Sequence, residues 1–400
     1  MKHVARSFFH RVKFSVLLCE KASCYSVFKT NFMNKANYII LLLSLAFVNC
    51  NGQSASDSIL KQQIGQMLVV GFRGTELSPD NHIVSDIQQL NIGGVILFDY
   101  DGPSKSYNRN IVSVRQLKKL NQELQNLTNE KLIISIDQEG GLVNRLKPKY
   151  GFPASVSAEK LGKLNNEDST KYYANLTAGT LKNAGFNVNF APCVDVNINP
   201  NCPIIGGKER SFSGDSKLVF NNANWWLQEQ QKMGIIGCVK HFPGHGSAET
   251  DTHLGTTDVT KTWKEEEILP YQELIKAGNT HMVMTSHIYN ANLDEKYPAT
   301  MSKAILTGIL REQLKFEGVI ITDDLAMGAM VKNYSFEEIL EKAINAGANL
   351  LCLSNNGDSY DPQIAQKAVD TIFRLVKSGK IERKTIETSY TRIMKLKETL

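Results

Sequence analysis

The sequence predicts an α/β fold, a single (β/α)8 barrel of the TIM type, over residues 59–400. Eight short apolar runs rich in β-branched residues alternate with segments whose apolar residues have helical spacing. Such an alternation is typical of a parallel sheet that is covered on both faces. Eight units over about 330 residues fit a closed barrel better than a doubly wound open sheet. The first run also lacks the Gly-x-Gly-x-x-Gly turn of dinucleotide-binding sheets.

The apolar runs place the strands in chain order. The predicted strands are residues 67–72, 94–98, 132–136, 186–190, 235–239, 281–285, 319–322 and 348–353. Five strands follow a glycine that is expected to end the preceding helix, namely Gly185, Gly234, Gly278, Gly318 and Gly347. Two helices have start signals. Ser302 is a good N-cap for one, and Ser335 with Glu338 forms a capping box before another.

Residues 1–50 are predicted to be an N-terminal extension and a signal peptide. An apolar run after Lys35 has the length of a signal-peptide core and is too short to span a bilayer comfortably. A start at Met33 instead of Met1 would give a signal peptide of ordinary length. The chain is therefore expected to be exported, to the periplasm or cell envelope. Cys50 is a candidate for lipidation, which would tether the protein to a membrane.

A polar linker is predicted at residues 51–58, before the barrel. After the last predicted strand, about 45 residues remain, which is enough for helices but not for a second C-terminal domain. We therefore expect one catalytic domain.

Composition and charge narrow the possible partners. The chain is 42% hydrophobic and 21% charged, which is typical of a globular protein with a substantial core. The net charge of +5 arises in residues 1–49, which contain seven Lys and Arg and one acid; the remainder has 38 basic and 39 acidic residues. This balance gives no reason to expect nucleic acid as a partner. Oligomeric state is left open.

The cysteines indicate neither a disulfide scaffold nor a metal site. Seven cysteines in 400 residues are too few for a scaffold, and no Cys-x-x-Cys pair is present. Cys193 and Cys202 lie close in one predicted loop, so a bridge between them is one of two open alternatives.

Histidines gather after the fifth predicted strand. His241, His245 and His253 are three of the eight histidines, and they share one glycine-rich loop with Lys240 and Asp251. A single histidine is more often structural, but three beside two charged residues indicate a functional site.

Other polar residues follow the remaining strands. They are Asp137, Asp195, His287, Asp323 and Asp324. One aspartate at a strand end is as often a helix cap as a functional residue. The whole set predicts a pocket at the C-terminal face of the barrel, where barrel enzymes have their active sites.

Three reaction types suit such a pocket. Metal-assisted hydrolysis usually needs a His-x-His pair after the first strand, where residues 71–73 are Gly-Phe-Arg. Imine chemistry could use Lys240, but residues 355–357 make a poor phosphate loop. Glycoside hydrolysis needs one group to attack the anomeric carbon and another to protonate the leaving oxygen.

Four motifs resemble those of family-3 glycoside hydrolases, in the β-N-acetylhexosaminidase branch known from peptidoglycan recycling. Residues 240–246, Lys-His-Phe-Pro-Gly-His-Gly, with Asp-Thr-His at 251–253 resemble that family's signature. Residues 136–145 are similar to its first sugar-binding motif and 209–212 to its second, and 321–327 are similar to its nucleophile motif. The matches run in family order over about residues 60 to 395, the whole predicted barrel.

The resemblance implies catalytic roles for three residues. Asp323 would be the nucleophile of a retaining mechanism, with Asp324 the competing assignment. His253 would be the general acid/base, and Asp251 would orient its ring and stabilise the imidazolium.

The resemblance also implies a set of sugar-binding residues. They are Asp137, Arg145, Arg210, Lys240 and His241, which would hold the hydroxyl groups through charge-assisted hydrogen bonds. His245 is expected to brace its loop, while Asp195 and His287 are open between structural support and substrate contact. One departure is Leu142, where the family motif often has Arg.

The implied function is that of a retaining exo-β-N-acetylhexosaminidase. It would release terminal β-linked N-acetylglucosamine from peptidoglycan fragments or chitin-like oligosaccharides, without a metal or an organic cofactor. A β-N-acetylglucosaminide phosphorylase on the same barrel is the main alternative, because a histidine acid/base avoids repelling phosphate. A β-glucosidase would draw its acid/base from an added domain. A non-catalytic sugar-binding barrel would be expected to have lost Asp323 or His253.

Overall fold

The computed structural model describes residues 55–400, and these contain a closed eight-stranded parallel barrel. Its strands are β1 (Leu68–Gly71), β2 (Gly94–Ile96), β5 (Ile133–Ile136), β6 (Val188–Asn189), β7 (Ile236–Phe242), β9 (Met282–Thr285), β11 (Val319–Ile321) and β12 (Leu351–Leu353). The hydrogen-bonded order is β11-β9-β7-β6-β5-β2-β1-β12. A parallel bridge between Ile321 and Leu350 joins the first and last strands of this order. The predicted barrel and its eight strands are confirmed.

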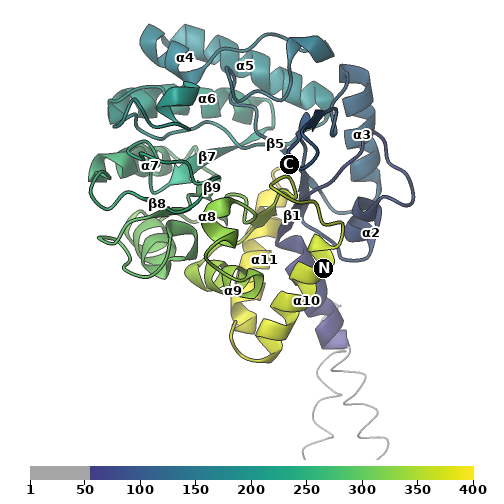
Figure 1. Cartoon of the computed structure of the whole chain (residues 1–400). Coiled ribbons are helices and arrows are strands. Elements are labelled where there is room, and N and C mark those ends of the chain that lie inside the picture. Colours follow the sequence, from purple (N-terminus) through teal and green to yellow (C-terminus); the bar gives the residue numbers. More distant parts are fainter. Residues whose placement is uncertain (1–54) are drawn as a thin grey trace, which may run out of the picture. The chain divides into compact units, whose positions relative to one another are not determined.

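Helices surround the strands (Figure 1). They are residues 55–66, α2 (His82–Gln88), α3 (Val114–Asn126), α4 (Ala158–Leu164), α5 (Glu167–Ala184), α6 (Ser216–Lys232), α7 (Leu269–Lys276), a π-helix (Ala304–Gln313), α8 (Gly328–Val331), α9 (Phe336–Ala346), α10 (Ile364–Lys377) and α11 (Arg383–Lys397). Two small sheets decorate the loops, β3 (Tyr100–Asp101) with β4 (Ser106–Tyr107), and β8 (Thr257–Asp258) with β10 (Ile288–Tyr289). Short 3-10 turns are Pro148–Tyr150, Gly206–Lys208, Glu265–Ile268 and Ala299–Met301.

The sequence signals for helix ends are largely confirmed. The hydroxyl of Ser335 accepts the backbone N–H of Glu338 at 3.3 Å, and Ser302 accepts that of Ile305 at 3.1 Å. Gly347 ends α9 at φ 117°, a conformation that favours glycine. Gly318 differs, because it is not in the left-handed region; a Cβ there would lie 2.4 Å from the carbonyl oxygen of His281.

The expectations for the start of the chain need correction or fall outside the described residues. The linker predicted at 51–58 is wrong for residues 55–58, which are already helical. Contacts with the C-terminal helices explain this order, since Asp57 pairs with Lys377 at 3.1 Å and Ser56 accepts a hydrogen bond from Arg383 at 2.7 Å. The signal peptide, the start at Met1 or Met33 and Cys50 lie outside the described residues.

Cys193 and Cys202 are both buried and both free thiols, so the bridge weighed from the sequence is not formed. Each thiol has its own acceptor: Cys193 donates to Asp195 at 3.1 Å, and Cys202 donates to the carbonyl of His245 at 3.6 Å. Among the helices of residues 55–400, none combines the length and the apolarity that crossing a membrane requires.

Candidate active site

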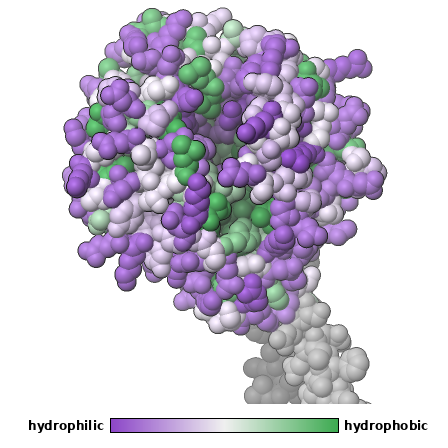
Figure 2. Space-filling view, in the orientation of Figure 1, coloured by the Kyte–Doolittle hydropathy of each residue, from purple (hydrophilic) through white to green (hydrophobic). Residues whose placement is uncertain are grey.

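The carboxyl ends of the strands surround a hollow, which Figure 2 shows near the centre of one face. Two cavities of about 530 and 430 Å³ meet there. We call the first the clamp chamber, lined by Glu139, Arg210, Lys240, His241 and Asp251 among others. The second chamber is lined among others by Phe98, Tyr100, Leu254, Met327 and Asn356. Four residues line both chambers, namely Asp137, Arg145, His253 and Asp323.

Lys240, two residues before the last residue of β7, is a buried cation held by two carboxylates. Its ammonium lies 2.8 Å from Asp137 and 2.7 Å from Glu139. Burial alone would lower the pKa of Lys240, but the two carboxylates outweigh it and raise the pKa. Lys240 therefore stays charged and can donate to a ligand in the clamp chamber.

Glu139 is a site residue to which the sequence analysis gave no role. Its carboxylate accepts two hydrogen bonds from Arg210, each 2.8 Å, besides its contact with Lys240. Burial alone would raise the pKa of Glu139, but Arg210 and Lys240 together lower it to about 2. The sequence spacing of Glu139 was a usable signal. Glu139 is two residues after Asp137, so both carboxylates can reach one cluster, and the two buried cations Lys240 and Arg210 need more than one acid.

Asp195 supports the site from beneath it. Its fully buried carboxylate accepts hydrogen bonds from Nδ1 of His241 at 2.7 Å and from the backbone N–H of His245 at 2.7 Å. Nδ1 of His241 therefore carries a proton, and Nε2 can accept a hydrogen bond from Arg210 at 3.0 Å. Asp195 lines neither chamber, so of its two open roles the structure favours structural support.

The neighbouring aspartates after β11 differ in their contacts. Asp324 accepts hydrogen bonds from the backbone N–H groups of Ser354 at 3.0 Å and Ala326 at 3.2 Å, and also from the Ser354 hydroxyl. It thereby joins the loops after β11 and β12, and burial raises its pKa. Among the residues that the structure describes, the Asp323 carboxylate accepts only the Asp324 backbone N–H, at 2.8 Å, and it lines both chambers.

Asp323 is ionised at neutral pH. Burial alone would raise its pKa, but the rings of His241, His287 and His253 and the Asp324 N–H outweigh burial and lower the pKa to about 2. The N–H contributes at every pH, whereas the rings contribute fully only when protonated. Asp323 is thus an anion that has little competing hydrogen bonding and faces an open cavity.

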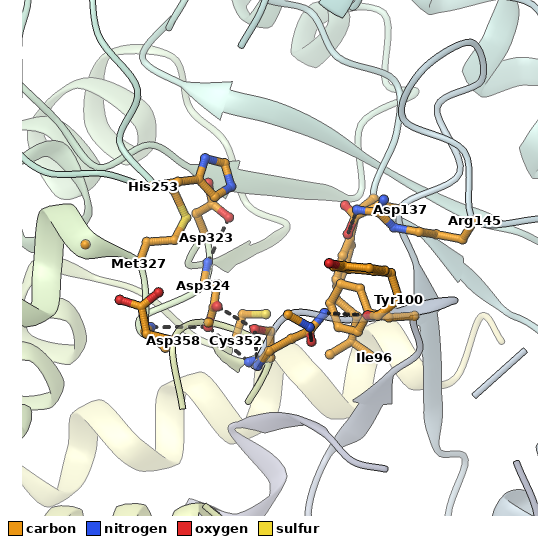
Figure 3. A pocket seen from close by; sticks show the side chains of 18 of the residues that line it. Ile96, Tyr100, Asp137, Arg145, His253, Asp323, Asp324, Met327, Cys352 and Asp358 are labelled. Carbon is orange, nitrogen blue, oxygen red and sulfur yellow. Dashed lines mark hydrogen bonds and ion pairs between the residues drawn. The ribbon is translucent and has the colours of Figure 1, made fainter. Parts of the chain in front are cut away.

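His253 and Asp251 form a pair on the loop between β7 and β8. The ring Nδ1 lies 2.6 Å from the Asp251 carboxylate, which also accepts the His253 backbone N–H at 2.8 Å. This ring hydrogen bond raises the pKa of His253. The side chain is 60% exposed, and Nε2 is the ring atom left for a ligand. Figure 3 shows His253 beside Asp323, although the two come from different loops.

Three further residues from the sequence analysis lie at or near the chambers: Arg145, expected to bind sugar, His245, expected to brace its loop, and His287, whose role was open. Arg145 lines both chambers and lies 3.9 Å from Asp137. His245 is buried, and its Nε2 lies 3.2 Å from the Thr252 hydroxyl, so it braces the loop as expected. His287 is buried in a structural position, bonded to Thr300 at 2.7 Å and to the Asp324 carbonyl at 2.9 Å.

The second chamber was not predicted. Figure 3 shows Tyr100 and Ile96 on the side of it that also carries Asp137 and Arg145. Its wall depends on Arg109, which is buried and donates to carbonyls after β1 and β12 and to Asp101. Tyr100, Asp101 and Arg109 all follow β2 in a stretch without a recognisable motif, so no local signal in the sequence indicated this wall.

The combination of fold and site defines a class of protein. An ionised carboxylate and a carboxylate-bound imidazole face one cavity, next to a cluster of charged hydrogen-bond donors. This arrangement at the mouth of a (β/α)8 barrel is suited to carbohydrate chemistry, in which one group attacks and another transfers a proton.

Comparisons with known proteins identify the family. Residues 59–396 match the model of the glycosyl hydrolase family 3 N-terminal domain. The chain therefore belongs to glycosyl hydrolase family 3, which makes it a member of the glycoside hydrolase class.

Individual relatives agree with this assignment. The chain is 30% identical to β-hexosaminidase A of Pseudoalteromonas piscicida, over 85% of this chain and 61% of the relative. It is 32% identical to a β-hexosaminidase of Tolumonas auensis, over 72% of this chain and 83% of the relative. A solved family 3 β-N-acetylglucosaminidase from Paenibacillus sp. str. FPU-7 is 33% identical with a TM-score of 0.77, over 85% of this chain and 62% of that one. The chain thus spans less than two thirds of the Pseudoalteromonas and Paenibacillus proteins.

Proposed function

We propose that this chain is a retaining exo-β-N-acetylhexosaminidase that releases terminal β-linked N-acetylglucosamine. The observation that carries the proposal is the meeting of Asp323 and the Asp251–His253 pair at the boundary of the two chambers. The names of the β-hexosaminidase and β-N-acetylglucosaminidase relatives support the sugar. Peptidoglycan fragments and chitin-like oligosaccharides are both suitable sources of that sugar.

In the first step, the Asp323 carboxylate forms a bond to the anomeric carbon. Nε2 of protonated His253 gives its proton to the glycosidic oxygen, and the bond from that oxygen to the anomeric carbon breaks. In the second step, neutral His253 takes a proton from water while the water oxygen attacks the same carbon. Asp323 then leaves as a carboxylate, and the configuration of the sugar is retained.

The residues of the clamp chamber would bind the terminal sugar. Lys240, Arg210 and Arg145 would donate to hydroxyl groups, and Asp137 would accept from them. His241 would act mainly by holding Arg210, because both of its ring nitrogens already have partners. Charged groups in a fixed geometry cost little to order when the sugar binds.

The test compares aryl and alkyl β-N-acetylglucosaminides. Asp323→Ala is expected to abolish turnover of both, by about 10⁴-fold or more, while circular dichroism shows an intact fold. His253→Ala is expected to reduce kcat/KM far more for the alkyl glycoside, because only a poor leaving group needs protonation. Retained turnover in Asp323→Ala, or equal losses on both substrates in His253→Ala, would contradict the proposal. Formation of N-acetylglucosamine 1-phosphate in phosphate buffer would indicate a phosphorylase instead.

A further inference from the structure

The loop that carries His253 is bonded to the helix that follows the nucleophile. The backbone N–H groups of Gly328 and Ala329, in the first turn of α8, donate to the carbonyls of His253 at 3.2 Å and Thr252 at 3.0 Å. A Cβ at Gly328 would lie 2.5 Å from the His253 carbonyl oxygen. The loop and α8 therefore approach each other as closely as their backbones allow.

Two side chains at the end of α8 extend this contact to the tip of the loop. The ammonium of Lys332 donates to the Leu254 carbonyl at 2.8 Å, and the Asn333 amide donates to the Thr256 hydroxyl at 3.0 Å. The amide of Asn333 also donates to the Ala329 carbonyl at 2.9 Å, which fixes its direction. We call Lys332 and Asn333 the latch pair.

Burial does little to hold the tip of this loop. Its side chains from residue 253 to 256 are exposed or half-buried, and Leu254 is 72% exposed. Without apolar burial, hydrogen bonds have to supply most of the free energy that keeps such a segment in one position. α8 starts five residues after Asp323, so these bonds tie the acid/base loop to the segment that carries the nucleophile.

We propose that Lys332 and Asn333 are positioning residues that hold the loop tip against α8 and so keep His253 facing Asp323. The proposal rests on the role of His253 under the proposed function. Neither residue lines a chamber, so neither contacts the substrate. Loss of the latch pair would let the tip leave α8, and the fraction of molecules with His253 in position would fall.

The test is the Lys332→Ala/Asn333→Ala double variant, assayed with leaving groups of graded acidity. For alkyl glycosides we expect kcat/KM to fall about tenfold, since one charged and one neutral hydrogen bond are lost at a partly exposed site. For nitrophenyl glycosides we expect a change of about twofold or less, because their departure needs no proton. The single variant Lys332→Arg keeps a cationic donor, so its kcat/KM for alkyl glycosides is expected to stay close to that of the wild type. Lys276→Ala is the matched control, because Lys276 is an exposed helix lysine that pairs with Glu273 on its own helix.

Hydrogen exchange gives a readout that does not depend on activity. Amides of residues 252–257 are expected to exchange faster in the double variant, with the barrel strands unchanged. Unchanged exchange there, or equal losses of kcat/KM on both substrate types, would overturn the latch. An inactive double variant with wild-type exchange would also overturn it. If His253→Ala itself spares alkyl glycosides, the proposed function fails, whatever the latch variants do.

Discussion

At the scale of single residues, Asp323 and Asp324 have identical side chains but different surroundings, which give them different roles. Among the described residues, Asp324 accepts three hydrogen bonds, two of which come from Ser354 and join two loops, whereas Asp323 accepts one and faces the cavity. A nucleophile must have lone pairs that are free of strong donors. The family motif favours Asp323 as the nucleophile, and these contacts give an independent physical reason for the same assignment.

The pairing of His253 with Asp251 sets the protonation state of the general acid. The carboxylate stabilises the imidazolium and raises the pKa of His253, so the acid stays protonated to higher pH. Asp251→Asn removes this stabilisation. We expect the basic limb of the kcat/KM profile to move to lower pH, because that limb reports the acid in the free enzyme.

The control for this pH shift is Asp258→Asn. Asp258 lies on β8, directly after this loop, but accepts hydrogen bonds from Thr260 instead of His253. The basic limb of the kcat/KM profile of Asp258→Asn is expected to match that of the wild type. A limb that does not move in Asp251→Asn would show that Asp251 does not control the proton on His253.

At the scale of elements, Glu267 on the 3-10 turn Glu265–Ile268 supports the histidine loop from below. Its carboxylate is buried and accepts the Gly246 backbone N–H at 2.9 Å. Gly244 leaves no room between loop and turn, because a Cβ there would lie 2.4 Å from the Glu267 side chain. The tip of the loop depends on α8, and its base depends on this turn.

Glu267 makes stability depend on pH. Burial raises its pKa to about 7, from 4.5 in an exposed chain. Between these values the folded protein binds a proton that the unfolded chain does not, so the free energy of unfolding falls as pH rises through this window. Glu267→Gln keeps a neutral acceptor for Gly246. We expect the stability of the wild type relative to this variant to fall by up to about 3 kcal/mol from pH 4.5 to 7.

Denaturant unfolding of both proteins at several pH values provides the measurement. A difference in unfolding free energy that is constant from pH 4 to 8 would refute the claim that Glu267 is protonated when buried. A difference that grows in the opposite direction would do the same.

Much of the element level could be predicted from the sequence, because strand runs, helix caps and glycine stops are local signals. The strand predicted at residues 235–239 corresponds to β7, which extends three residues further, to Phe242, and the cap at Ser335 is confirmed. The helix after Ser302 is a π-helix, however, and its apolar spacing resembled that of an α-helix. Glu267 could not be predicted as a loop support, since its contact with Gly246 depends on how separate segments pack.

At the scale of the whole molecule, the site depends on the pairing of β1 with β12, the first and last barrel strands along the chain. Gly71, the last residue of β1, lies against the backbone of Ser354, and a Cβ there would be 1.8 Å from the Ser354 carbonyl oxygen. Arg109 bonds to the same carbonyl at 3.3 Å. We call this contact between the end of β1 and Ser354 the seam, and Ser354 forms part of the wall of the second chamber.

Gly71→Ala is therefore expected to destabilise the barrel by several kcal/mol, because the methyl group meets backbone and not a flexible side chain. Gly179→Ala is the matched control. Gly179 lies within α5 with no atom near its missing Cβ, so alanine is expected to stabilise the protein by about 0.5–1 kcal/mol. Thermal unfolding of both variants checks this. Equal melting temperatures would contradict the account of the seam.

The distribution of the site over the barrel explains what the sequence could and could not reveal. Asp137, Lys240 and Asp323 directly follow predicted strands, so the fold class alone predicted that they would converge. The second chamber depends on contacts between loops after β1, β2 and β12, such as those of Arg109, and long-range contacts of this kind leave no periodic pattern. Glu139 is an intermediate case. Its place after a strand could be predicted from the sequence, but its ion pairs with Arg210 and Lys240 could not.

The central claim is that Asp323 forms a covalent bond to the anomeric carbon. A 5-fluoro glycosyl fluoride of N-acetylglucosamine tests it directly, because its good leaving group lets the intermediate form while the ring fluorine slows its hydrolysis. After brief exposure, proteolysis and mass spectrometry of the peptides, we expect one added sugar on Asp323. A label on Asp324 or Asp137, or turnover without any labelled peptide, would contradict the claim.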